Sequence, residues 1–425
     1  MGRFLCFINE ARDIGEFHQD FPEHEFFFVS QLPLPGAGAV VRPETVGQSL
    51  EEVGRQHAAK AFTGMVFGSS LELYVKTADQ CARALGLRRF VTDPEAVRDK
   101  HAMRLALAGR VACPESRVVT AERAAADLPD LRFPCVLKPR HGFGSICVFK
   151  ATNRSELTAA QRGMQAALDF LVRQHPLVIP STDMLLESFV GGTEHTAELF
   201  VVDGQPVLEL VSDKLPMQAP YFIESGDVMP SRLAADALEL IKAAARAAVA
   251  AVGVVWGWAH VEIKLDGGVA YVIEIAGRPG GGYTRAMVRR AYGLDPRRVL
   301  IEAQTGLLPI HQVSEASTVF GRNVVCEGIE LVVALPGLAE ANRCDGFHVV
   351  RNRFQGTPRI FLGPPLSFDS TILSYFVCDP IPETAVEKFR KVDSALRVRR
   401  LRIPIKSPAT LAALFAAIAF FRPRR

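Results

Sequence analysis

The sequence lacks the features that would place it at once in several large classes of protein. Its 425 residues contain 49 Lys and Arg against 46 Asp and Glu, and a net charge of +3 does not mark a binder of nucleic acid or of another polyanion. The eight cysteines include no Cys-x-x-Cys pair and no zinc-like or disulfide-like spacing, since they stand at positions 6, 81, 113, 135, 147, 326, 344 and 378. We therefore expect reduced, mostly buried thiols.

Long apolar runs are also lacking. The apolar stretch at residues 409–421 is well short of the roughly 20 apolar residues that span a bilayer, so we expect no transmembrane segment. On a helix it would carry one apolar stripe beside the basic chain end, made of Leu411, Leu414, Phe415, Ile418 and Phe421. We favour docking of this tail on the protein's own surface; an interfacial membrane helix or a partner contact is the alternative. Charged residues from Glu10 onward break up any secretory signal, which favours a cytoplasmic protein.

Length and local pattern predict several domains with α/β and α+β character. At roughly 100 to 200 residues per domain, the chain holds two to four packed units, and its 48% hydrophobic content supplies their cores. We expect a small α/β domain, a larger α+β domain, a strand-rich C-terminal α+β domain and an amphipathic basic tail, over residues 1–95, 96–305, 306–405 and 406–425. No repeat or low-complexity segment interrupts them.

The local patterns behind this division are short strands and a few helices. Strands are predicted at residues 26–29, 64–67, 133–139, 148–150 and 184–190. Helices are predicted at residues 71–85, 155–173, 233–252 and 383–396. The dipeptides Asp203-Gly204 and Asp266-Gly267, each flanked by β-prone runs, predict two hairpin turns.

The first motif with chemical meaning is KPRHGFGS at residues 138–145, at the end of a predicted strand. Glycines let backbone N–H groups approach a phosphate closely, and Lys138 supplies a positive charge. The motif is neither a Walker loop nor a dinucleotide-binding fingerprint, and such a turn taken alone is more often structural.

The second motif is ESFVGGTE at residues 187–194, where a strand ends in a linker between two acids. An extended linker exposes backbone groups that can pair with a purine edge, and a carboxylate a few residues later can accept bonds from ribose hydroxyls. An ordinary strand end with surface acids explains the same residues.

The third motif is a predicted hairpin, WAHVEIK at 258–264 followed by VIEIAGRPGG at 272–281. Period-two alternation places His260, Glu262 and Lys264 on one face, and the hairpin can bring Glu274 opposite. Two facing carboxylates repel unless a cation lies between them, and hard oxygen ligands favour Mg²⁺. The alternative is a solvated face on which Lys264 and Arg278 form ion pairs.

In this order the three motifs resemble those of the ATP-grasp superfamily, over residues 64–305. The resemblance implies an ATP-grasp fold in which lysines contact the ATP phosphates and a glycine loop covers them, here Lys100, Lys138, Gly142, Gly144 and Ser145. It implies that Glu187 faces the adenine amino group, that the backbone of Ser188 and Val190 binds the ring, and that Glu194 holds the ribose. It further implies Mg²⁺, or Mn²⁺ in its place, on Glu262 and Glu274, with catalytic roles for Lys138 and Arg278.

Within the superfamily the chain is most similar to the L-amino-acid ligases of bacilysin-synthetase type. The residues that carry this similarity are Asp99-Lys100 with Arg104, VSDK at 211–214, PYFIESG at 220–226, Pro230-Ser231, and His260 two residues before Glu262. That resemblance implies an ADP-forming enzyme that joins a small carboxylate to an amine through an acyl phosphate. One departure is Ala276 in place of the usual metal-site Asn; a water can replace the lost ligand because Mg²⁺ tolerates a mostly aqueous shell.

Two other functions stay open at this stage. The chain can be an ATP-binding module without catalysis, or a carboxylase-type or nucleotide-biosynthesis enzyme. The last would need a basic cluster for a phosphorylated substrate, for which the candidates are Arg289, Arg290, Arg297 and Arg298. A solvated helix face is the favoured interpretation of these arginines. The expected partners are small-molecule substrates and not nucleic acid, and a homodimer is left open.

Overall fold

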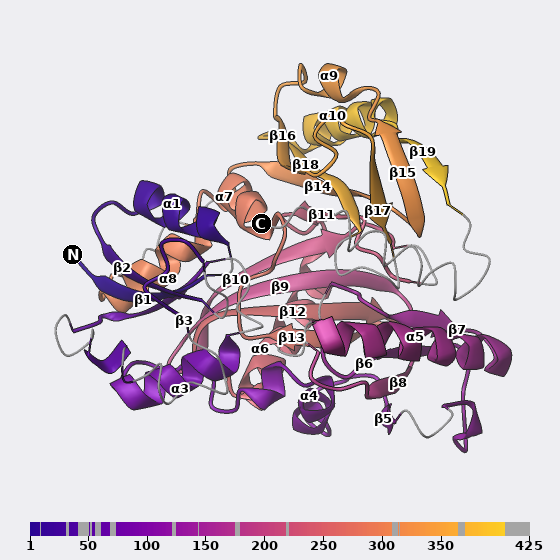
Figure 1. The fold of residues 1–425 in the computed structure, drawn as a ribbon, viewed down its shortest axis with the longest axis horizontal. Coiled ribbons are helices and arrows are strands. Elements are labelled where there is room, and N and C mark those ends of the chain that lie inside the picture. The colour runs from indigo at the N-terminus through magenta and orange to yellow at the C-terminus, as the bar shows by residue number, and fades with distance from the viewer. Residues whose placement is uncertain are drawn as a thin grey trace.

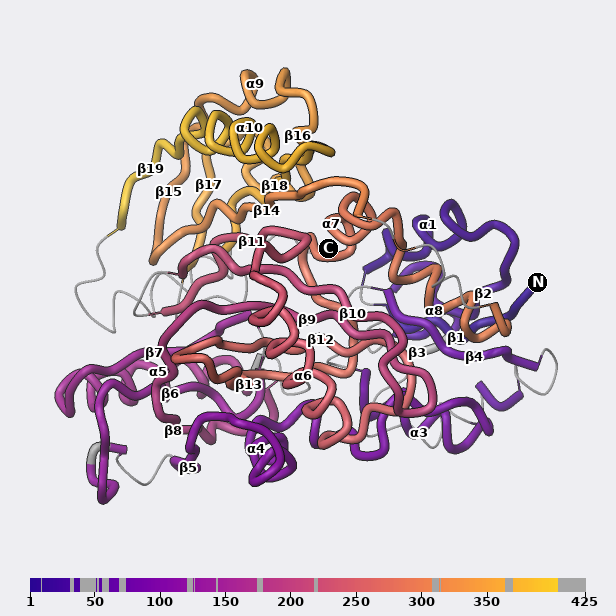
Figure 2. Tube along the Cα trace, turned by 180° about the vertical axis from the view of Figure 1, so that it is seen from behind, coloured from indigo at the N-terminus to yellow at the C-terminus, as the bar shows by residue number. Residues whose placement is uncertain are grey.

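The computed structural model describes residues 1–8, 10–30, 34–40, 51, 53–55, 61–68, 74–120, 125–142, 144–174, 179–217, 221–307, 313, 315–363 and 370–403. These residues form four sheets, and three of them lie around the long strands of the fourth, central sheet (Figure 1). Seen from behind, the N-terminal sheet and a small antiparallel sheet lie at opposite ends of the central strands, and the C-terminal strands lie above them (Figure 2). The predicted tail, 406–425, falls outside the described residues.

The N-terminal sheet is parallel, with strand order β3-β2-β1-β4. Its elements are β1 (Arg3–Phe7), α1 (Ala11–Asp20), β2 (Glu25–Ser30), β3 (Ala39–Val40), β4 (Gly64–Phe67) and α3 (Val75–Leu85). β1 is a nearly continuous apolar run because a parallel strand is buried on both faces. The strands predicted at 26–29 and 64–67 are confirmed, and so is the described part of the predicted helix, which α3 forms.

The small sheet has strand order β5-β8-β6-β7 and is antiparallel. Its elements are β5 (Ser116–Val119), η4 (Ala125–Asp127), β6 (Cys135–Pro139), β7 (Phe149–Ala151), α5 (Arg154–Gln174) and β8 (Met184–Ser188). Alternate residues such as Leu137 and Leu186 pack with α5 into a separate apolar core. The residues that follow these two along their strands, Lys138 and Glu187, therefore point to the other face of the sheet.

The central sheet has strand order β13-β12-β9-β10-β11-β14-β18-β16 and is antiparallel throughout. Its first half is built from β9 (Thr193–Val202), β10 (Gln205–Lys214), β11 (Gly226–Met229), α6 (Ala235–Val252), β12 (Trp256–Asp266) and β13 (Val269–Ala276). The hairpin turn at Asp203-Gly204 is confirmed, with φ angles of 49° and 78° that fit a primed turn. The second turn is one residue later than predicted: Asp266 still pairs with Val269, so the turn residues are Gly267 and Gly268.

Four short helical elements connect the sheets. They are η3 (Glu95–Val97), α4 (Lys100–Leu107), α7 (Thr284–Tyr292) and α8 (Pro296–Gln304). The Asp99 side chain caps α4 by accepting the His101 N–H at 2.9 Å, and this cap fixes the start of α4 at Lys100. Asp295 caps α8 in the same way.

The C-terminal segment extends the central sheet instead of forming a fully separate one, because β11 pairs with β14 across residue 305. Its elements are β14 (Thr318–Val325), β15 (Ile329–Ala334), α9 (Leu338–Ala341), β16 (Phe347–Asn352), β17 (Arg359–Leu362), β18 (Thr371–Asp379), α10 (Pro382–Ala395) and β19 (Arg399–Arg402). β17, β15 and β19 form a three-stranded sheet, and α10 confirms the helix predicted near 383–396.

One large core joins the N-terminal sheet, α4, the first strands of the central sheet and α6 to α8. All eight cysteines are reduced and five of them are buried, as expected from their spacing. Among the described residues, no helix is both long and apolar enough to cross a membrane.

Candidate functional site

A cavity of about 1310 Å³ opens between the central sheet, the small sheet, the N-terminal sheet and the C-terminal strands. Every residue that the sequence predicted for the site lines this cavity: Lys100, Lys138, Gly142, Gly144, Ser145, Glu187, Ser188, Val190, Glu194, Glu262, Glu274 and Arg278. Three motifs that stand at residues 138–145, 187–194 and 258–281 are thus brought to one place.

Glu187 lies at the small-sheet side of the cavity and is held by two cations. Its Oε1 accepts from Arg104 Nε at 2.9 Å, and its Oε2 lies 2.7 Å from Lys138 Nζ. Burial raises the pKa of Glu187, but Lys138 and Arg104 outweigh burial and lower it. Burial also lowers the pKa of Lys138. In this structure both carboxylate oxygens of Glu187 face cations, which fixes the Lys138 ammonium at the cavity wall.

Lys100, the first residue of α4, connects the glycine loop to β13. Its Nζ donates to the carbonyl of Gly142 at 2.6 Å and lies 3.1 Å from Glu274 Oε1. The loop itself needs glycine or strained backbone, since φ is 136° at Gly142, 62° at Gly144 and 53° at Ser145. Arg140, at the start of this loop, makes a two-pronged bond to the Asp99 carboxylate. Residue 143 lies outside the described residues.

The two predicted metal carboxylates face each other across the hairpin. Glu262 on β12 pairs directly with Glu274 on β13, as the alternation predicted. Lys214 Nζ lies 2.9 Å from Glu262 Oε1, and Lys100 lies beside Glu274. Ala276 adds no ligand, and among the described residues no group of three or more His, Cys, Asp or Glu side chains is arranged to hold a metal ion. Two carboxylates fit Mg²⁺, which completes its shell with waters and phosphate oxygens.

Lys214 is a residue whose importance the sequence did not reveal. Its Nζ lies 2.9 Å from Glu262, 3.0 Å from Glu194 and 3.3 Å from Glu224. Burial lowers the pKa of Lys214, but these carboxylates raise it well above its ordinary value. Its side chain is buried at the end of β10. In the sequence, the VSDK motif that contains Lys214 contributed only to the family resemblance. The three acidic partners of Lys214 come from separate segments, so the motif alone could not reveal them.

The linker after β8 is lined by aromatic rings and lysines. Lys264 Nζ donates to the Val190 carbonyl at 3.0 Å, and Lys150 Nζ lies 3.7 Å from the centre of the Phe189 ring. The Phe222 ring stacks near Phe189 with centroids 6.3 Å apart. Glu194, predicted to hold the ribose, faces Lys214 and Lys264 at 3.0 and 3.9 Å. A planar ligand would therefore meet both aromatic and backbone groups here.

His260 and Asp227 add two titratable groups to the cavity wall. His260, Glu262 and Lys264 all line the cavity, which confirms that they share a face. Burial lowers the pKa of His260, but the Glu198 and Glu262 carboxylates outweigh burial and raise it to about 10. Burial and the nearby Glu224 raise the pKa of Asp227 to about 6.

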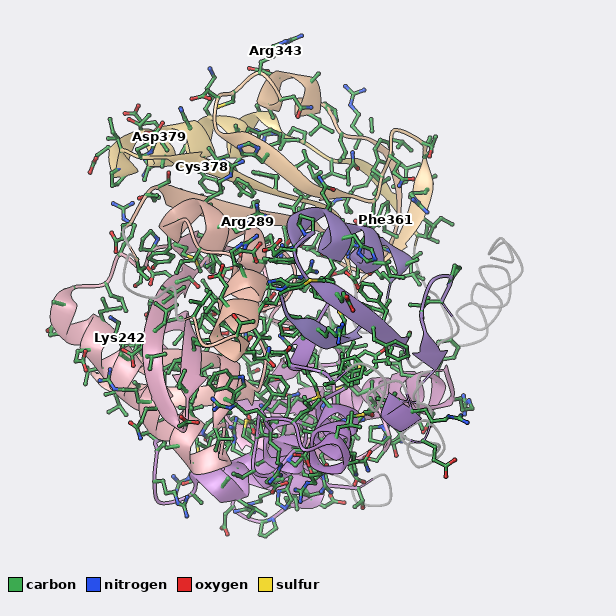
Figure 3. All side chains as sticks on the ribbon, turned by 90° about the vertical axis from the view of Figure 1, so that its left-hand side faces the viewer. Lys242, Arg289, Arg343, Phe361, Cys378 and Asp379 are labelled. Atoms are coloured by element: carbon green, nitrogen blue, oxygen red, sulfur yellow. The ribbon has the colours of Figure 1, made fainter. Side chains whose placement is uncertain are left out.

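The arginines of α7 and α8 divide into two groups. Arg289 is exposed on α7, between the N-terminal and C-terminal parts of the chain (Figure 3), as expected of a solvated helix face. That expectation is wrong for Arg297, whose side chain is only 10% exposed. Arg297 lies 2.9 Å from Glu16 and 3.5 Å from Asp13, so it holds α1 against α8.

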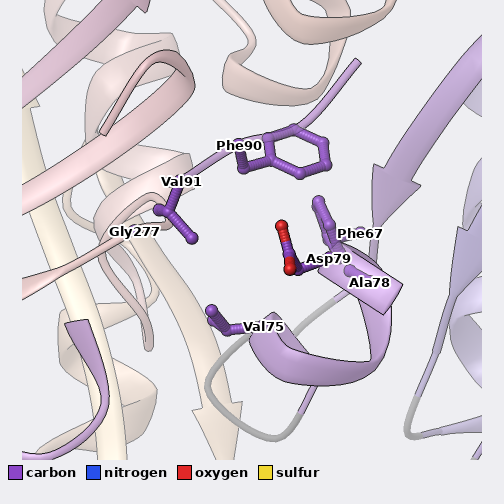
Figure 4. A pocket seen from close by; sticks show the side chains of 7 residues that line it. All are labelled: Phe67, Val75, Ala78, Asp79, Phe90, Val91 and Gly277. Carbon is purple, nitrogen blue, oxygen red and sulfur yellow. The ribbon is translucent and has the colours of Figure 1, made fainter. Parts of the chain in front are cut away.

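A second, much smaller cavity lies between α3 and the turn after β13 (Figure 4). Its volume is about 10 Å³, and it is lined by apolar side chains, Gly277 and Asp79. The Asp79 carboxylate is paired with Arg83 at 2.8 Å and Arg89 at 2.6 Å. This cavity has room for about one water molecule and is not a ligand site.

Comparison with known protein families and sequences supports the fold. Residues 131–286 match the family model described as ATP-grasp domain. Carnosine synthase 1 of Homo sapiens is 31% identical over 204 residues, which cover 46% of this chain and 24% of that protein. Alanine–anticapsin ligase of Bacillus subtilis is 27% identical over 277 residues, which cover 61% of this chain and 57% of the relative. The chain thus spans only about a quarter to somewhat over half the length of these relatives.

Solved structures extend the likeness over nearly the whole chain. The L-amino acid ligase from Bacillus licheniformis has a TM-score of 0.73 at 20% identity, covering 95% of this chain and 99% of that one. The N5-carboxyaminoimidazole ribonucleotide synthetase from Thermotoga maritima has a TM-score of 0.64 at 19% identity, covering 94% and 99%. A biotin carboxylase domain from Hydrogenobacter thermophilus, solved with MgADP, has a TM-score of 0.64 at 14% identity, covering 95% and 92%. The chain therefore has the ATP-grasp fold, which confirms that prediction.

Proposed function

From the ATP-grasp domain at residues 131–286, we propose that this protein is an ATP- and Mg²⁺-dependent ligase. It joins the carboxylate of one small molecule to the amine of another, releasing ADP and phosphate, and its substrates are amino acids or related natural products. The observation that carries this proposal is one cavity in which two facing carboxylates, Glu262 and Glu274, lie beside the cations of Lys100 and Lys214.

The nucleotide would bind along the small sheet. Lys100 donates to the Gly142 carbonyl of the glycine loop and lines the cavity with Lys138, and both would contact the phosphates together with Gly142, Gly144 and Ser145. Ser188 and Val190 would offer backbone groups to the adenine, Glu187 would face its amino group, and Glu194 would hold the ribose. Support comes from their common position on the cavity wall and from the carboxylates that already hold both lysines in place.

The metal ion would be Mg²⁺, or Mn²⁺ in its place, held by Glu262 and Glu274. It supplies positive charge that stabilises phosphoryl transfer. The protein's own part is to supply further cations. Lys138 and Arg278 would contact the transferred phosphoryl group, and Arg278 has the planar fork that suits a carboxylate or an oxyanion. Arg278 lines the same cavity, two residues past Ala276 at the end of β13.

The reaction then has two balanced steps. A carboxylate oxygen of the first substrate attacks the γ-phosphorus of ATP, which forms an acyl phosphate and releases ADP. The amine nitrogen attacks the acyl carbon, the C–O bond breaks, and inorganic phosphate leaves while the nitrogen loses a proton. Both steps require the reacting groups to be held in line and kept from water, which a cavity enclosed by several sheets supports.

The cavity has room for substrates besides the nucleotide. Its volume exceeds the roughly 300 to 1,000 Å³ of most single-ligand pockets. Polar side chains of the C-terminal strands, among them Asn323, Arg351 and Ser374, also line the cavity. The names alanine–anticapsin ligase and L-amino acid ligase describe ligases of amino acids, and this supports small amino-acid substrates here. The reduced thiols support a cytoplasmic location.

A panel of amino acids tested in pairs would examine the proposal. Phosphate release from ATP should require both partners of a productive pair, and mass spectrometry should find their condensation product. Glu262→Gln serves as the inactive control. Absence of ATP turnover with every pair would favour a binding module without catalysis.

The carboxylase-type alternative is favoured by one observation, the likeness to a biotin carboxylase domain and an N5-carboxyaminoimidazole ribonucleotide synthetase. Bicarbonate as the carboxylate donor therefore belongs in the panel. Against this alternative, Arg297 and Arg298 pair with acids of the N-terminal segment and do not form an open basic cluster.

A further inference from the structure

Glu198 is a buried carboxylate in the middle of the central sheet and has no part in the proposed reaction steps. Only 1% of it is exposed. On β9 it pairs directly with His260 of β12, and its Oε1 lies 2.5 Å from His260 Nδ1. Its other oxygen, Oε2, accepts the backbone N–H of Gly280 at 2.9 Å. Both oxygens therefore hold neighbouring parts of the structure.

His260 continues this connection toward the proposed metal site. Its second ring nitrogen, Nε2, lies 3.6 Å from Glu262 Oε1. The turn after β13, residues 277–282, is thus linked through Gly280, Glu198 and His260 to the carboxylate of Glu262. Arg278 lies in the same turn, two residues before Gly280. One buried pair therefore connects the segment that carries Arg278 with one of the two metal carboxylates.

Gly280 is the glycine of this turn that packs closely against Glu198 and His260. A Cβ on Gly280 would lie 2.5 Å from Glu198 Oε1, 2.9 Å from His260 Nδ1 and 2.8 Å from Thr284 Oγ1. A Cβ on the next residue, Gly281, would meet nothing within 4 Å. Neither glycine has a positive φ, so the contrast between them arises from contacts and not from backbone strain.

We propose that Glu198 and His260 are positioning residues, which hold the turn of Arg278 in register with the Glu262 carboxylate. This inference rests on the proposed function for the roles of Arg278 and Glu262. The physical reason is that a displacement of about 1 Å at a reacting group can cost about 100-fold in rate. A purely structural pair would stabilise the sheet without affecting metal binding or separating kcat from KM.

The test compares Gly280→Ala with Gly281→Ala, which add the same methyl group to the same turn. Two quantities are measured: kcat and KM for ATP with a productive substrate pair, and the affinity for Mn²⁺ by electron paramagnetic resonance with a non-hydrolysable ATP analogue bound. For Gly280→Ala we expect kcat to fall about 100-fold with little change in KM, and Mn²⁺ affinity to fall about tenfold. For Gly281→Ala we expect both changes to be within about threefold. Equal behaviour of the two variants would overturn the proposal.

Glu198 variants test the same link without adding bulk to the turn. Glu198→Gln keeps an acceptor for Gly280 but loses the charge that faces His260, so it should weaken Mn²⁺ binding while the urea unfolding midpoint shows a folded protein. The Glu198→Ala/Gly280→Ala double variant should lose less than the sum of the two single losses, because the methyl group then meets only Thr284 and His260 and no longer displaces the carboxylate. Additive losses, or Glu198→Gln with wild-type Mn²⁺ affinity, would refute the link. The Mn²⁺ measurements need no substrate pair, so failure of the proposed ligase reaction stays distinguishable.

Discussion

Two charged clusters line the same cavity and are built differently. The lysine cluster lies at the proposed ATP site and contains Lys100, Lys138 and Lys214 with Glu187, Glu194, Glu262 and Glu274. The arginine cluster lies where α7 and α8 meet the N-terminal segment and contains Arg285, Arg297 and Arg298 with Asp13, Glu16, Asp20 and Glu23. The same two kinds of charge thus serve two different parts of the molecule.

The difference lies in the cations. A lysine ammonium is a flexible point charge that can exchange one oxygen partner for another, whereas an arginine fork fixes the geometry of its carboxylate partners. Arg285, for instance, bonds both oxygens of Asp295 and also Asp20. We infer that the lysine side chains can turn from their carboxylate partners to the phosphates of a nucleotide. The arginine cluster instead holds the N-terminal sheet in place. Three predictions separate these roles, in order of decreasing effect.

The largest effect should follow loss of one of the two proposed metal carboxylates. Glu274→Ala should lower ATP turnover by about 100- to 1000-fold, because the cation would lose one of its two protein ligands. The variant should stay folded, since Lys100 keeps the Gly142 carbonyl as a partner. Lys138→Ala should show the same pattern. Steady-state phosphate release and urea unfolding measure the two quantities. Near-normal turnover of Glu274→Ala in Mg²⁺ would show that the metal assignment is wrong.

The arginine cluster should affect stability instead. Arg297→Met leaves the buried Asp13 without this partner and should lower the free energy of unfolding by about 3 kcal/mol. Arg298→Met is the matched control: Arg298 is 42% exposed and pairs with an exposed Glu23, so its loss should cost less than about 1 kcal/mol. Urea unfolding compares them. If Arg298→Met were as destabilising as Arg297→Met, burial would not explain the role of this cluster.

Asp227 tests how completely the positive charge of the lysine cluster offsets the negative charge of the carboxylates around it. Tyr283 donates to its carboxylate at 2.7 Å, yet burial and Glu224 raise its pKa to about 6 from an ordinary 3.8. Because the pKa of Asp227 is raised in the folded state, the protonated carboxyl group contributes to the free energy of unfolding. That contribution is complete below about pH 4 and is lost as the pH rises through about 6. Asp227→Asn should remove that dependence, so the variant should gain about 2 kcal/mol relative to wild type between pH 4 and 7.5.

The measurement is urea unfolding of both proteins across that pH range, in which the other titrating groups cancel. Glu224→Gln should reduce the effect, because Glu224 raises the pKa of Asp227. A difference between variant and wild type that does not change with pH would show that Asp227 titrates normally in the folded protein.

The sequence was most informative where the function depends on strand alternation and chain order. Period-two alternation placed Glu262 and Glu274 opposite each other, and the β12–β13 register confirms it. The same rule brings Lys138 to the cavity, because Cys135 and Leu137 on β6 pack into the core that contains α5. Local turn preferences predicted both hairpins. One of the two turns lies one residue later than predicted, at Gly267-Gly268 instead of Asp266-Gly267. Adjacent dipeptides with similar turn preference cannot be separated by sequence alone.

Long-range partners were not predictable. Arg104 and Glu187 are 83 residues apart, and Lys214 meets acids 20, 10 and 48 residues away. The continuation of the central sheet across residue 305 depends on the pairing of β11 with β14, which no local pattern encodes. Burial of Arg297 arises from a contact with α1, more than 280 residues earlier in the chain. Tertiary packing decides such features, and the residues involved look like solvated charges when taken alone.

The central claim is that the carboxylate is activated at the γ-phosphate, because the facing carboxylates, Lys138 and Arg278 line the same cavity. Isotope tracing with an ¹⁸O-labelled carboxylate substrate tests it most directly. Chromatography should show ADP and inorganic phosphate as products, and mass spectrometry should find one ¹⁸O in that phosphate, transferred when the amine displaces the acyl phosphate. AMP and pyrophosphate as products, with the label in AMP, would contradict the account.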